Sequence, residues 1–279
     1  MTLIDGRPLA AEIRETASGT VAELVASGTT PTVAVVIATD DGATDWYARS
    51  IESASTKVGI AATRVTPALT REAVLDTIDR LAADPTVHGI ICLTPLPDGL
   101  TLAEAGERIP AAKDVDGASP WSLGRLAAGL PAFAPATAQA VVEILRHEAV
   151  PLEGAEIAVV GRSTVVGKPL ALLLLAENAT VTVCHSRTRD LPSVTSRADV
   201  VVAAVGQTHL IGAEHVRAGA IVIDVGTNAT DDGGLVGDVD TDAVAARAAG
   251  VTPVPGGVGP VTTAILLRNV AQAAGASTR

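Results

Sequence analysis

The run from Ile157 to Leu170 constrains the fold more than any other part of the sequence, because it combines a buried strand, a tight turn and a helix start. It opens with four consecutive apolar residues, which is typical of a strand covered on both faces. Gly161 and Gly167 then permit close backbone approach, and a helix that begins there directs free N–H groups at a pyrophosphate. The spacing departs from the standard glycine pattern, so an ordinary strand-to-helix turn is the alternative. The candidate cofactor residues of this turn are Gly161, Arg162, Ser163 and Gly167.

A second candidate cofactor segment follows the next expected strand, at 180–184. An NAD site places an acidic residue there, about 20 residues beyond the glycines. This chain has His185, Ser186 and Arg187 instead. A hydroxyl and a guanidinium suit a 2′-phosphate, which a carboxylate would repel. The segment therefore predicts NADP as the cofactor, unless Arg187 and Arg189 only solvate a surface loop.

Strand-like and helix-like segments alternate along the chain. Helical spacing of apolar residues is found at 7–26, 46–58, 71–83, 137–147 and 261–274. Compact apolar runs are found at 32–38, 61–65, 89–93, 157–160, 180–184, 200–205 and 220–225. The alternation predicts an α/β fold with mostly parallel strands and with functional residues at their carboxyl ends.

The periodicity fails between Ile109 and Pro135, where turn residues gather, and a chain of 279 residues is long enough for two domains. We therefore expect an N-terminal α/β domain formed by 1–117 and 261–279, and a Rossmann-like domain formed by 118–260. In this arrangement the C-terminal helix returns to the first domain.

Composition excludes several classes of function. The net charge of −11 argues against binding to nucleic acid or to an anionic membrane. Two isolated cysteines give neither a disulfide framework nor the spacing of metal ligands, so no metal site is predicted. The sequence shows neither a secretory leader nor a long apolar span, and we expect a cytoplasmic protein.

Tyr47 and Asp116 are candidate ligand contacts in the first domain. Aromatic residues make up only 1% of the chain, and Tyr47 follows an acidic loop at the expected carboxyl edge of the sheet. It could stack on a planar ring, although packing against a neighbouring helix is the ordinary use of such a residue. Asp116 lies at the expected domain boundary and could bond a heterocycle, although an Asp in this setting is more often a turn former.

The chain resembles the bifunctional methylenetetrahydrofolate dehydrogenase/methenyltetrahydrofolate cyclohydrolase (FolD) family over nearly its whole length. The resemblance rests on motifs in a fixed order: Tyr47, Gly89-Ile-Ile, Thr94-Pro-Leu-Pro97, Lys113-Asp-Val-Asp-Gly117, Gly161-Arg-Ser163, Val166-Gly-Lys-Pro169, Asp224-Val-Gly226, Val236-Gly-Asp238 and Pro255-Gly-Gly-Val-Gly-Pro260.

This resemblance implies a folate-binding domain and an NADP-binding domain. The family oxidises 5,10-methylenetetrahydrofolate with NADP+ and then hydrolyses the methenyl product to 10-formyltetrahydrofolate. Tyr47 would stack on the folate, Asp116 would bond the pterin, and a homodimer is implied. Gly226 joins the implied cofactor residues. The implied substrate loop contributes Pro255, Gly256, Gly257 and Pro260.

Two departures from the family pattern affect the expected chemistry. The family places its catalytic Lys four residues after the Tyr, where this chain has Ile51, and the Gln that bonds this Lys is replaced by Leu93. A smaller departure is Asp45, which stands where the family has Gln. We expect an NADP-dependent dehydrogenase that has lost most or all cyclohydrolase activity. The alternatives are an ordinary bifunctional enzyme that uses another group, and a non-catalytic binding module or a relative adapted to another imine-like substrate.

Overall fold

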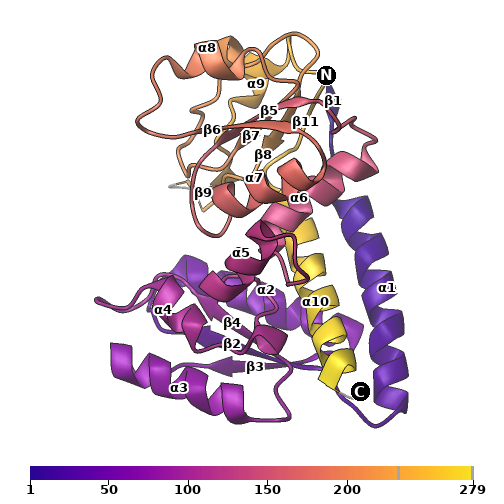
Figure 1. Ribbon diagram of the computed structural model, residues 1–279, viewed down its shortest axis with the longest axis vertical. Helices are drawn as coiled ribbons and strands as arrows, with labels where there is room; N and C mark the ends of the chain where they lie inside the picture. The colour runs from indigo at the N-terminus through magenta and orange to yellow at the C-terminus, as the bar shows by residue number, and fades with distance from the viewer. Residues whose placement is uncertain (231–232, 278–279) are drawn as a thin grey trace. The chain divides into compact units, whose positions relative to one another are not determined.

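The computed structural model describes residues 1–230 and 233–277, and the chain divides into two compact units (Figure 1). The six-strand unit consists of Met1–Ala10 and Thr137–Thr262. The three-strand unit consists of Ala11–Ala136 and Thr263–Arg279. Two long helices, α1 (Arg7–Ala26) and α10 (Val258–Ser277), each begin in the first of these units and continue into the second.

The three-strand unit contains a parallel sheet of order β3-β2-β4. Its strands are β2 (Thr32–Ile37), β3 (Ala61–Val65) and β4 (Gly89–Leu93). The helices between the strands are α2 (Gly42–Val58) and α3 (Arg71–Ala83). The sequence after β4 forms α4 (Leu102–Glu107), the 3-10 turn η1 (Ala111–Lys113) and α5 (Pro120–Ala127). Residues of β2 and β4 are buried on both faces, as continuous apolar runs predict.

The six-strand unit contains a parallel sheet of order β1-β11-β8-β7-β5-β6. The strands are β1 (Thr2–Leu3), β5 (Glu156–Val160), β6 (Thr180–Cys184), β7 (Val200–Ala203), β8 (Ile221–Asp224) and β11 (Gly250–Val251). The other elements are α6 (Ala136–His147), α7 (Gly167–Ala176), α8 (Leu191–Thr195), η2 (Ala213–His215), α9 (Thr241–Val244) and the antiparallel pair β9 (Asn228–Ala229) and β10 (Leu235–Val236). Strand β5 pairs with β6 on one side and β7 on the other, so the strand order reverses there.

The predicted α/β architecture with mostly parallel strands is confirmed, and so is the return of the C-terminal helix to the first domain. In the three-strand unit the Asn269 side chain of α10 donates a hydrogen bond of 2.8 Å to the Val115 carbonyl. The observed division of the chain differs from the expected boundaries by more than two residues at two places. Residues 1–10 lie in the six-strand unit because β1 pairs with β11, and residues 118–136 lie in the three-strand unit, where α5 contacts α4.

Two helices begin earlier than predicted. Helix α2 begins at Gly42 rather than at residue 46, because the Asp41 carboxylate accepts a hydrogen bond of 2.8 Å from the Thr44 backbone N–H and caps the helix. Its predicted end is correct, since Gly59 follows in a left-handed conformation with φ of 83°. Helix α10 begins at Val258 rather than at residue 261.

Candidate functional site

The segment Lys113–Gly117 is anchored on both sides of Asp116. The Lys113 ammonium donates hydrogen bonds to the carbonyl oxygens of Leu81, Ala82 and Asp84, at 3.1, 2.8 and 2.6 Å. These carbonyls lie at the C-terminal end of α3, where a cation is favoured by the helix dipole. Lys113 therefore serves as a cap for α3 and fixes the segment to it.

Asp114 and Val115 fix the next two positions. The Asp114 carboxylate is buried and accepts hydrogen bonds from the Ala118 and Ser119 N–H groups, both at 3.1 Å, and from the Ser122 hydroxyl at 2.5 Å. The Val115 side chain is fully buried, and its carbonyl accepts from Asn269. The backbone on either side of Asp116 is therefore fixed by its neighbours.

Asp116 is a half-buried carboxyl whose pKa is raised to about 7. Burial is the larger cause, and the nearby Asp114 charge adds to it, while a hydrogen bond from the Ala136 N–H acts in the opposite direction. This carboxyl changes its charge close to neutral pH. A group of this kind is typical of ligand sites, although structural networks also produce such shifts.

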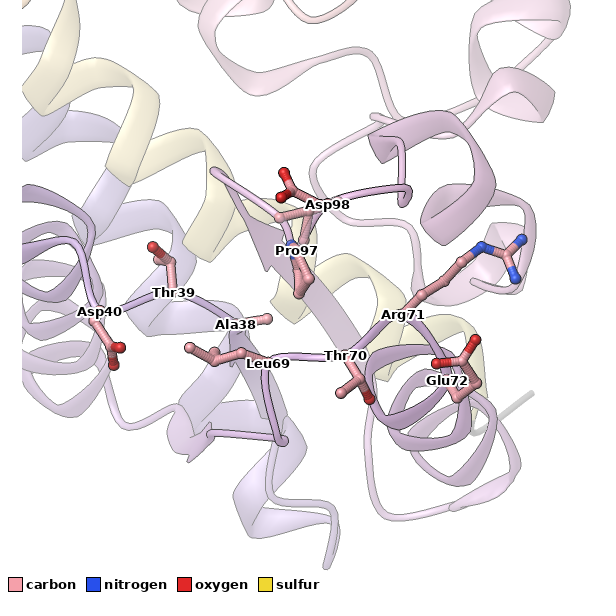
Figure 2. Close-up of a pocket in the computed structure, with 10 residues that line it drawn as sticks. Ala38, Thr39, Asp40, Leu69, Thr70, Arg71, Glu72, Pro97 and Asp98 are labelled. Atoms are coloured by element: carbon pink, nitrogen blue, oxygen red, sulfur yellow. The ribbon is translucent and has the colours of Figure 1, made fainter.

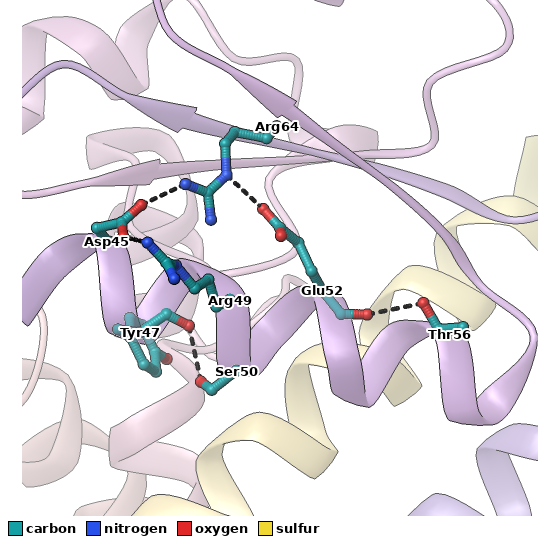
Figure 3. Close-up of polar contacts among 7 residues, drawn as sticks. All are labelled: Asp45, Tyr47, Arg49, Ser50, Glu52, Thr56 and Arg64. Carbon is teal, nitrogen blue, oxygen red and sulfur yellow. Dashed lines mark hydrogen bonds and ion pairs between the residues drawn. The ribbon is translucent and has the colours of Figure 1, made fainter.

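The structure brings Tyr47 near Asp116 within the three-strand unit. Tyr47 lies in α2, and burial together with the charge of Asp116 raises the pKa of its hydroxyl. The Ser50 hydroxyl donates a hydrogen bond of 2.7 Å to the Tyr47 carbonyl (Figure 3). The Tyr47 phenol stays protonated at neutral pH, so Tyr47 offers an aromatic face and a hydroxyl but no base.

Ile51 lies on the buried face of α2, one turn beyond Tyr47, and its side chain is 0% exposed. Leu93 is the last residue of β4, pairs in register with Ile37 and is also buried. Neither side chain carries a proton that could take part in catalysis. One turn beyond Ile51, the Ser55 hydroxyl is buried without a hydrogen-bond partner among the described residues.

Arg49 of α2 and Arg64 of β3 are held by carboxylates (Figure 3). Asp45 forms ion pairs with both Arg49 and Arg64, and Arg64 also pairs with Glu52 at 2.8 Å. Hydrogen bonds from the two guanidinium groups lower the pKa of Asp45. These contacts link α2 to β3, and they hold the guanidinium groups of both arginines in ion pairs.

An open pocket of about 610 Å³ lies at the carboxyl ends of the three-stranded sheet (Figure 2). It is lined by Ala38, Thr39, Asp40, Leu69, Thr70, Arg71, Glu72, Leu96, Pro97 and Asp98. Its one basic residue, Arg71, pairs with Glu104 at 3.1 Å. The pocket contains none of the predicted site residues, and we assign it no role.

The predicted cofactor turn forms a closed loop between β5 and α7. Gly161 has φ of 133°, which a residue with a side chain rarely adopts. A Cβ atom at Gly167 would lie 2.1 Å from the Gly161 carbonyl oxygen, so only glycine fits there. The Ser163 hydroxyl accepts hydrogen bonds from the N–H groups of Val166 at 3.1 Å and Gly167 at 3.4 Å. Ser163 thus replaces the second glycine of the standard pattern with a side chain that orders the turn, while Arg162 is exposed beside it.

The segment after β6 also forms a tight turn. The His185 backbone N–H donates to the Thr188 hydroxyl at 2.8 Å, and His185 Nδ1 accepts from the Arg187 N–H at 3.1 Å. The side chains of Ser186 and Arg187 are exposed at the carboxyl end of β6. Arg187 forms no ion pair within the described part of the chain.

The predicted substrate loop contacts the N-terminal segment. The Gly6 N–H donates to the Gly256 carbonyl at 3.0 Å, and the Gly257 N–H donates to the Pro253 carbonyl at 2.8 Å. Pro255 follows a cis peptide bond and is exposed, whereas Pro260 lies in the first turn of α10. Tyr47 and Asp116 lie in the three-strand unit, and this loop lies in the six-strand unit.

Two buried aspartates, Asp224 and Asp238, were not singled out as site residues from the sequence. Asp224 is the last residue of β8, in the same motif as the predicted cofactor residue Gly226, and Asp238 lies just after β10. Burial raises the pKa of Asp224 to about 6, against the opposing effect of three backbone hydrogen bonds. The sequence shows them only as members of two family motifs, and only the folded chain shows that they are buried.

Comparison with known proteins identifies the family. Residues 4–116 match the catalytic domain of the tetrahydrofolate dehydrogenase/cyclohydrolase family, and residues 135–278 match its NAD(P)-binding domain. The chain belongs to this family. The match to the NAD(P)-binding domain contains both predicted cofactor segments, and the match to the catalytic domain contains Tyr47, Ile51 and Asp116.

Individual members of the tetrahydrofolate dehydrogenase/cyclohydrolase family are similar over their full length. The bifunctional protein FolD of Parafrankia sp. is 62% identical over 99% of this chain and 100% of its own. The structure of the bifunctional enzyme FolD of Campylobacter jejuni has a TM-score of 0.94 at 38% identity, covering 99% of each chain. That of Trypanosoma brucei FolD, complexed with NADP cofactor and inhibitor, has a TM-score of 0.94 at 36% identity, covering 100% of this chain and 99% of its own.

No helix in the described residues is long and apolar enough to cross a membrane.

Proposed function

We propose that this chain oxidises 5,10-methylenetetrahydrofolate to 5,10-methenyltetrahydrofolate with NADP+, and that its cyclohydrolase activity is lost or very weak. The first half of the proposal is supported by the family, by its NAD(P)-binding domain and by the NADP complex of the Trypanosoma brucei relative. The second half rests on one observation, the complete burial of the Ile51 side chain one turn beyond Tyr47.

The turn from Gly161 to Gly167 fits a dinucleotide. Gly161 and Gly167, at the two ends of the turn, lie so close together that position 167 has no room for a Cβ atom. The turn leads directly into the N-terminus of α7. This is the arrangement by which parallel sheets hold a pyrophosphate. NADP+ supplies the hydride acceptor when bound. The exposed Ser186 and Arg187 would form hydrogen bonds to the 2′-phosphate of NADP+. Neither position carries a carboxylate that would repel this phosphate.

Tyr47 and Asp116 would bind the folate substrate. The Tyr47 ring offers a stacking surface, and the Asp116 carboxylate offers paired acceptors for the N–H groups of a pterin. The loop from Pro255 through Gly256 and Gly257 to Pro260 would complete the substrate-binding residues. Loss of a hydride from the methylene carbon leaves a cation that the two substrate nitrogens stabilise, so this step needs orientation and no protein acid.

Hydrolysis of the methenyl cation has a different requirement. The attacking water must lose a proton, and a protein acid or base typically contributes about 10²–10⁴-fold to such a step. Ile51 and Leu93 provide no such group. Arg49 and Arg64 are bound to carboxylates, and an arginine is a poor base in any case.

The main alternative is an ordinary bifunctional enzyme, which the names of relatives such as the Parafrankia protein favour. It would need a basic group other than the residue at position 51. A non-catalytic module for folate or NADP, or a relative with another imine-like substrate, is the further alternative.

A progress curve with methylenetetrahydrofolate and NADP+ tests the proposal. We expect reduction of NADP+ with equal accumulation of methenyltetrahydrofolate, which then decays at the rate measured without enzyme. Enzyme-dependent decay of methenyltetrahydrofolate would support the bifunctional alternative. Absence of any NADP+ reduction would support the non-catalytic alternative or a different substrate.

A further inference from the structure

The carboxylate of Asp238 is completely buried and accepts four hydrogen bonds. One oxygen accepts from the N–H groups of Val205 at 2.7 Å and Gly206 at 3.0 Å. The other accepts from the Gln207 N–H at 2.8 Å and from the Asn228 side chain at 3.0 Å. Asp238 therefore binds three consecutive backbone N–H groups of the loop that follows β7.

This loop lies at the point where the strand order of the six-stranded sheet reverses, between β5 and β7. Its first residue, Ala204, contacts the cofactor turn directly, because a Cβ atom at Gly161 would lie 2.2 Å from the Ala204 carbonyl oxygen. Ligands of open parallel sheets bind in the crevice at such a reversal, at the carboxyl ends of the strands. Gly206 and Gln207 are exposed residues at this edge.

The order of the strands indicates which half of a dinucleotide lies near this loop. The 2′-phosphate segment, Ser186 and Arg187, follows β6, so the adenosine half belongs on the β6 side of the cofactor turn. The nicotinamide half then extends to the opposite side, where the loops after β7 and β8 lie. The loop fixed by Asp238 is the nearer of these two.

Consecutive backbone N–H groups form a concave site for anions. In this chain the site is filled from within by the Asp238 carboxylate, so it is closed to a phosphate of the cofactor. The conformation of Val205–Gln207 is thereby set before any ligand binds.

Asp224 holds Asp238 in turn. Its carboxylate accepts from the N–H groups of Asp238 and Val239, both at 3.0 Å, and from the Gly226 N–H at 2.9 Å. Gly226 packs against the same group, since a Cβ atom there would lie 2.4 Å from the Asp238 carboxyl carbon. The loops after β7 and β8 are therefore joined through two buried carboxylates.

We propose that Asp238 is a positioning residue for the nicotinamide half of the cofactor, and that it acts through the backbone of Val205–Gln207. This inference rests on the proposed NADP-dependent function. Asp238 touches no reacting atom, and its effect comes from fixing one wall of the nicotinamide site.

Two ligands separate this role from a general structural one. NADP+ occupies both halves of the site, whereas adenosine 2′,5′-bisphosphate occupies the adenosine half alone. For Asp238→Asn we expect the Kd of NADP+ to rise roughly tenfold or more, because an amide cannot accept all four hydrogen bonds. The Kd of adenosine 2′,5′-bisphosphate should stay within about twofold of the unaltered protein, since its contacts lie on the other side of the turn.

Asp199→Asn is the matched control. Asp199 accepts a backbone hydrogen bond of 2.7 Å from the Glu156 N–H, at the amino end of the same sheet, and pairs with Arg217. This variant should leave both dissociation constants within about twofold. Asn228→Ala removes one donor to Asp238 and keeps the carboxylate, so it tests the proposal even if Asp238→Asn does not fold. We expect the Kd of NADP+ to rise roughly threefold, while the Kd of adenosine 2′,5′-bisphosphate stays within about twofold.

Equal weakening of both ligands in the Asp238 and Asn228 variants, or no weakening of NADP+ in either, would overturn the proposal. Failure of the unaltered protein to bind NADP+ is a separate outcome, and it would remove the proposed function together with this inference.

Discussion

Ile51 lies one helical turn beyond Tyr47 on α2, and its side chain is fully buried where that of Tyr47 is only half-buried. The same buried face carries Ala48, Ser55 and Val58, so Ile51 contributes to the packing of the helix. Position 51 is thus part of the apolar core in this chain. A Lys introduced at this position should therefore lower the stability of the protein.

Ile51→Lys should therefore restore little cyclohydrolase activity by itself. An ammonium placed in this site without a partner should lower the free energy of unfolding by roughly 2–5 kcal/mol. Urea unfolding measures this cost, and the enzyme-dependent decay of methenyltetrahydrofolate measures the activity. Ile51→Met is the control for packing and should cost less than about 1.5 kcal/mol.

The double variant Ile51→Lys with Leu93→Gln should restore more hydrolysis than the two single variants together. The amide would give the ammonium a partner, and coupled neighbours typically show interaction energies of about 0.5–3 kcal/mol. The comparison is a double-mutant cycle on the hydrolysis rate. Strictly additive effects would show that Leu93 has no part in the proposed loss of cyclohydrolase activity.

Asp116 should impose a pH dependence on folate use. Its pKa of about 7 means that the carboxylate, the form that accepts hydrogen bonds from a pterin, becomes dominant only as the pH rises through neutrality. We expect kcat/KM for methylenetetrahydrofolate to rise through about pH 7 and then to level off. Asp116→Asn should lower kcat/KM and remove this inflection, and a variant that keeps the inflection would exclude Asp116 as its source.

The raised pKa of Asp116 also makes the stability of the protein depend on pH, but here the contribution falls as the pH rises. The folded chain keeps the Asp116 proton up to about pH 7, whereas an unfolded chain releases it near the ordinary pKa of 3.8 for an aspartate. The contribution of this carboxyl to stability therefore falls between those two pH values and is constant above them. Asp116→Asn should make the unfolding free energy less dependent on pH in that window.

Arg187→Ala should narrow the preference for NADP+ over NAD+. A charge-assisted contact with a phosphate contributes on the order of 1.5–3 kcal/mol, which corresponds to a tenfold or greater preference. The ratio of kcat/KM for the two cofactors measures the effect, and Arg189→Ala, an exposed neighbour two residues further on, is the control. Equal kcat/KM values for NADP+ and NAD+ in the unaltered protein would contradict the role of Arg187.

The order and type of the longer elements could be predicted from the sequence because periodicity and turn chemistry agree there. The run from β5 to α7 is an example, with its apolar strand, its glycines and its helix start. The two-residue strands β1 and β11 could not be predicted in this way, because so short a segment has no periodicity and is held only by its neighbours in the sheet.

Only part of the candidate site could be predicted from the sequence. The sequence indicates Tyr47 and Asp116 separately, and their electrostatic interaction depends on tertiary structure that spacing does not reveal. The sequence shows Asp224 and Asp238 only as members of family motifs, and the burial that distinguishes them comes from segments that the sheet brings together. Residues that act through long-range hydrogen bonds are the ones that sequence patterns miss.

Lys113 provides the last prediction, which concerns how Asp116 is held. Its ammonium donates to three carbonyls at the end of α3, and burial lowers its pKa, while the nearby charge of Asp84 acts in the opposite direction. Lys113→Met keeps the apolar stem but leaves these carbonyls without their cation, so the unfolding free energy should fall by about 2 kcal/mol. Lys57→Met, at an exposed position in the last turn of α2, should change the unfolding free energy by less than about 0.5 kcal/mol.

Because the Lys113 segment leads directly into Asp116, the KM for the folate substrate should also rise in Lys113→Met while the Kd of NADP+ stays unchanged. A loss of stability with an unaltered KM would show that Asp114 and Val115 fix Asp116 without help from Lys113.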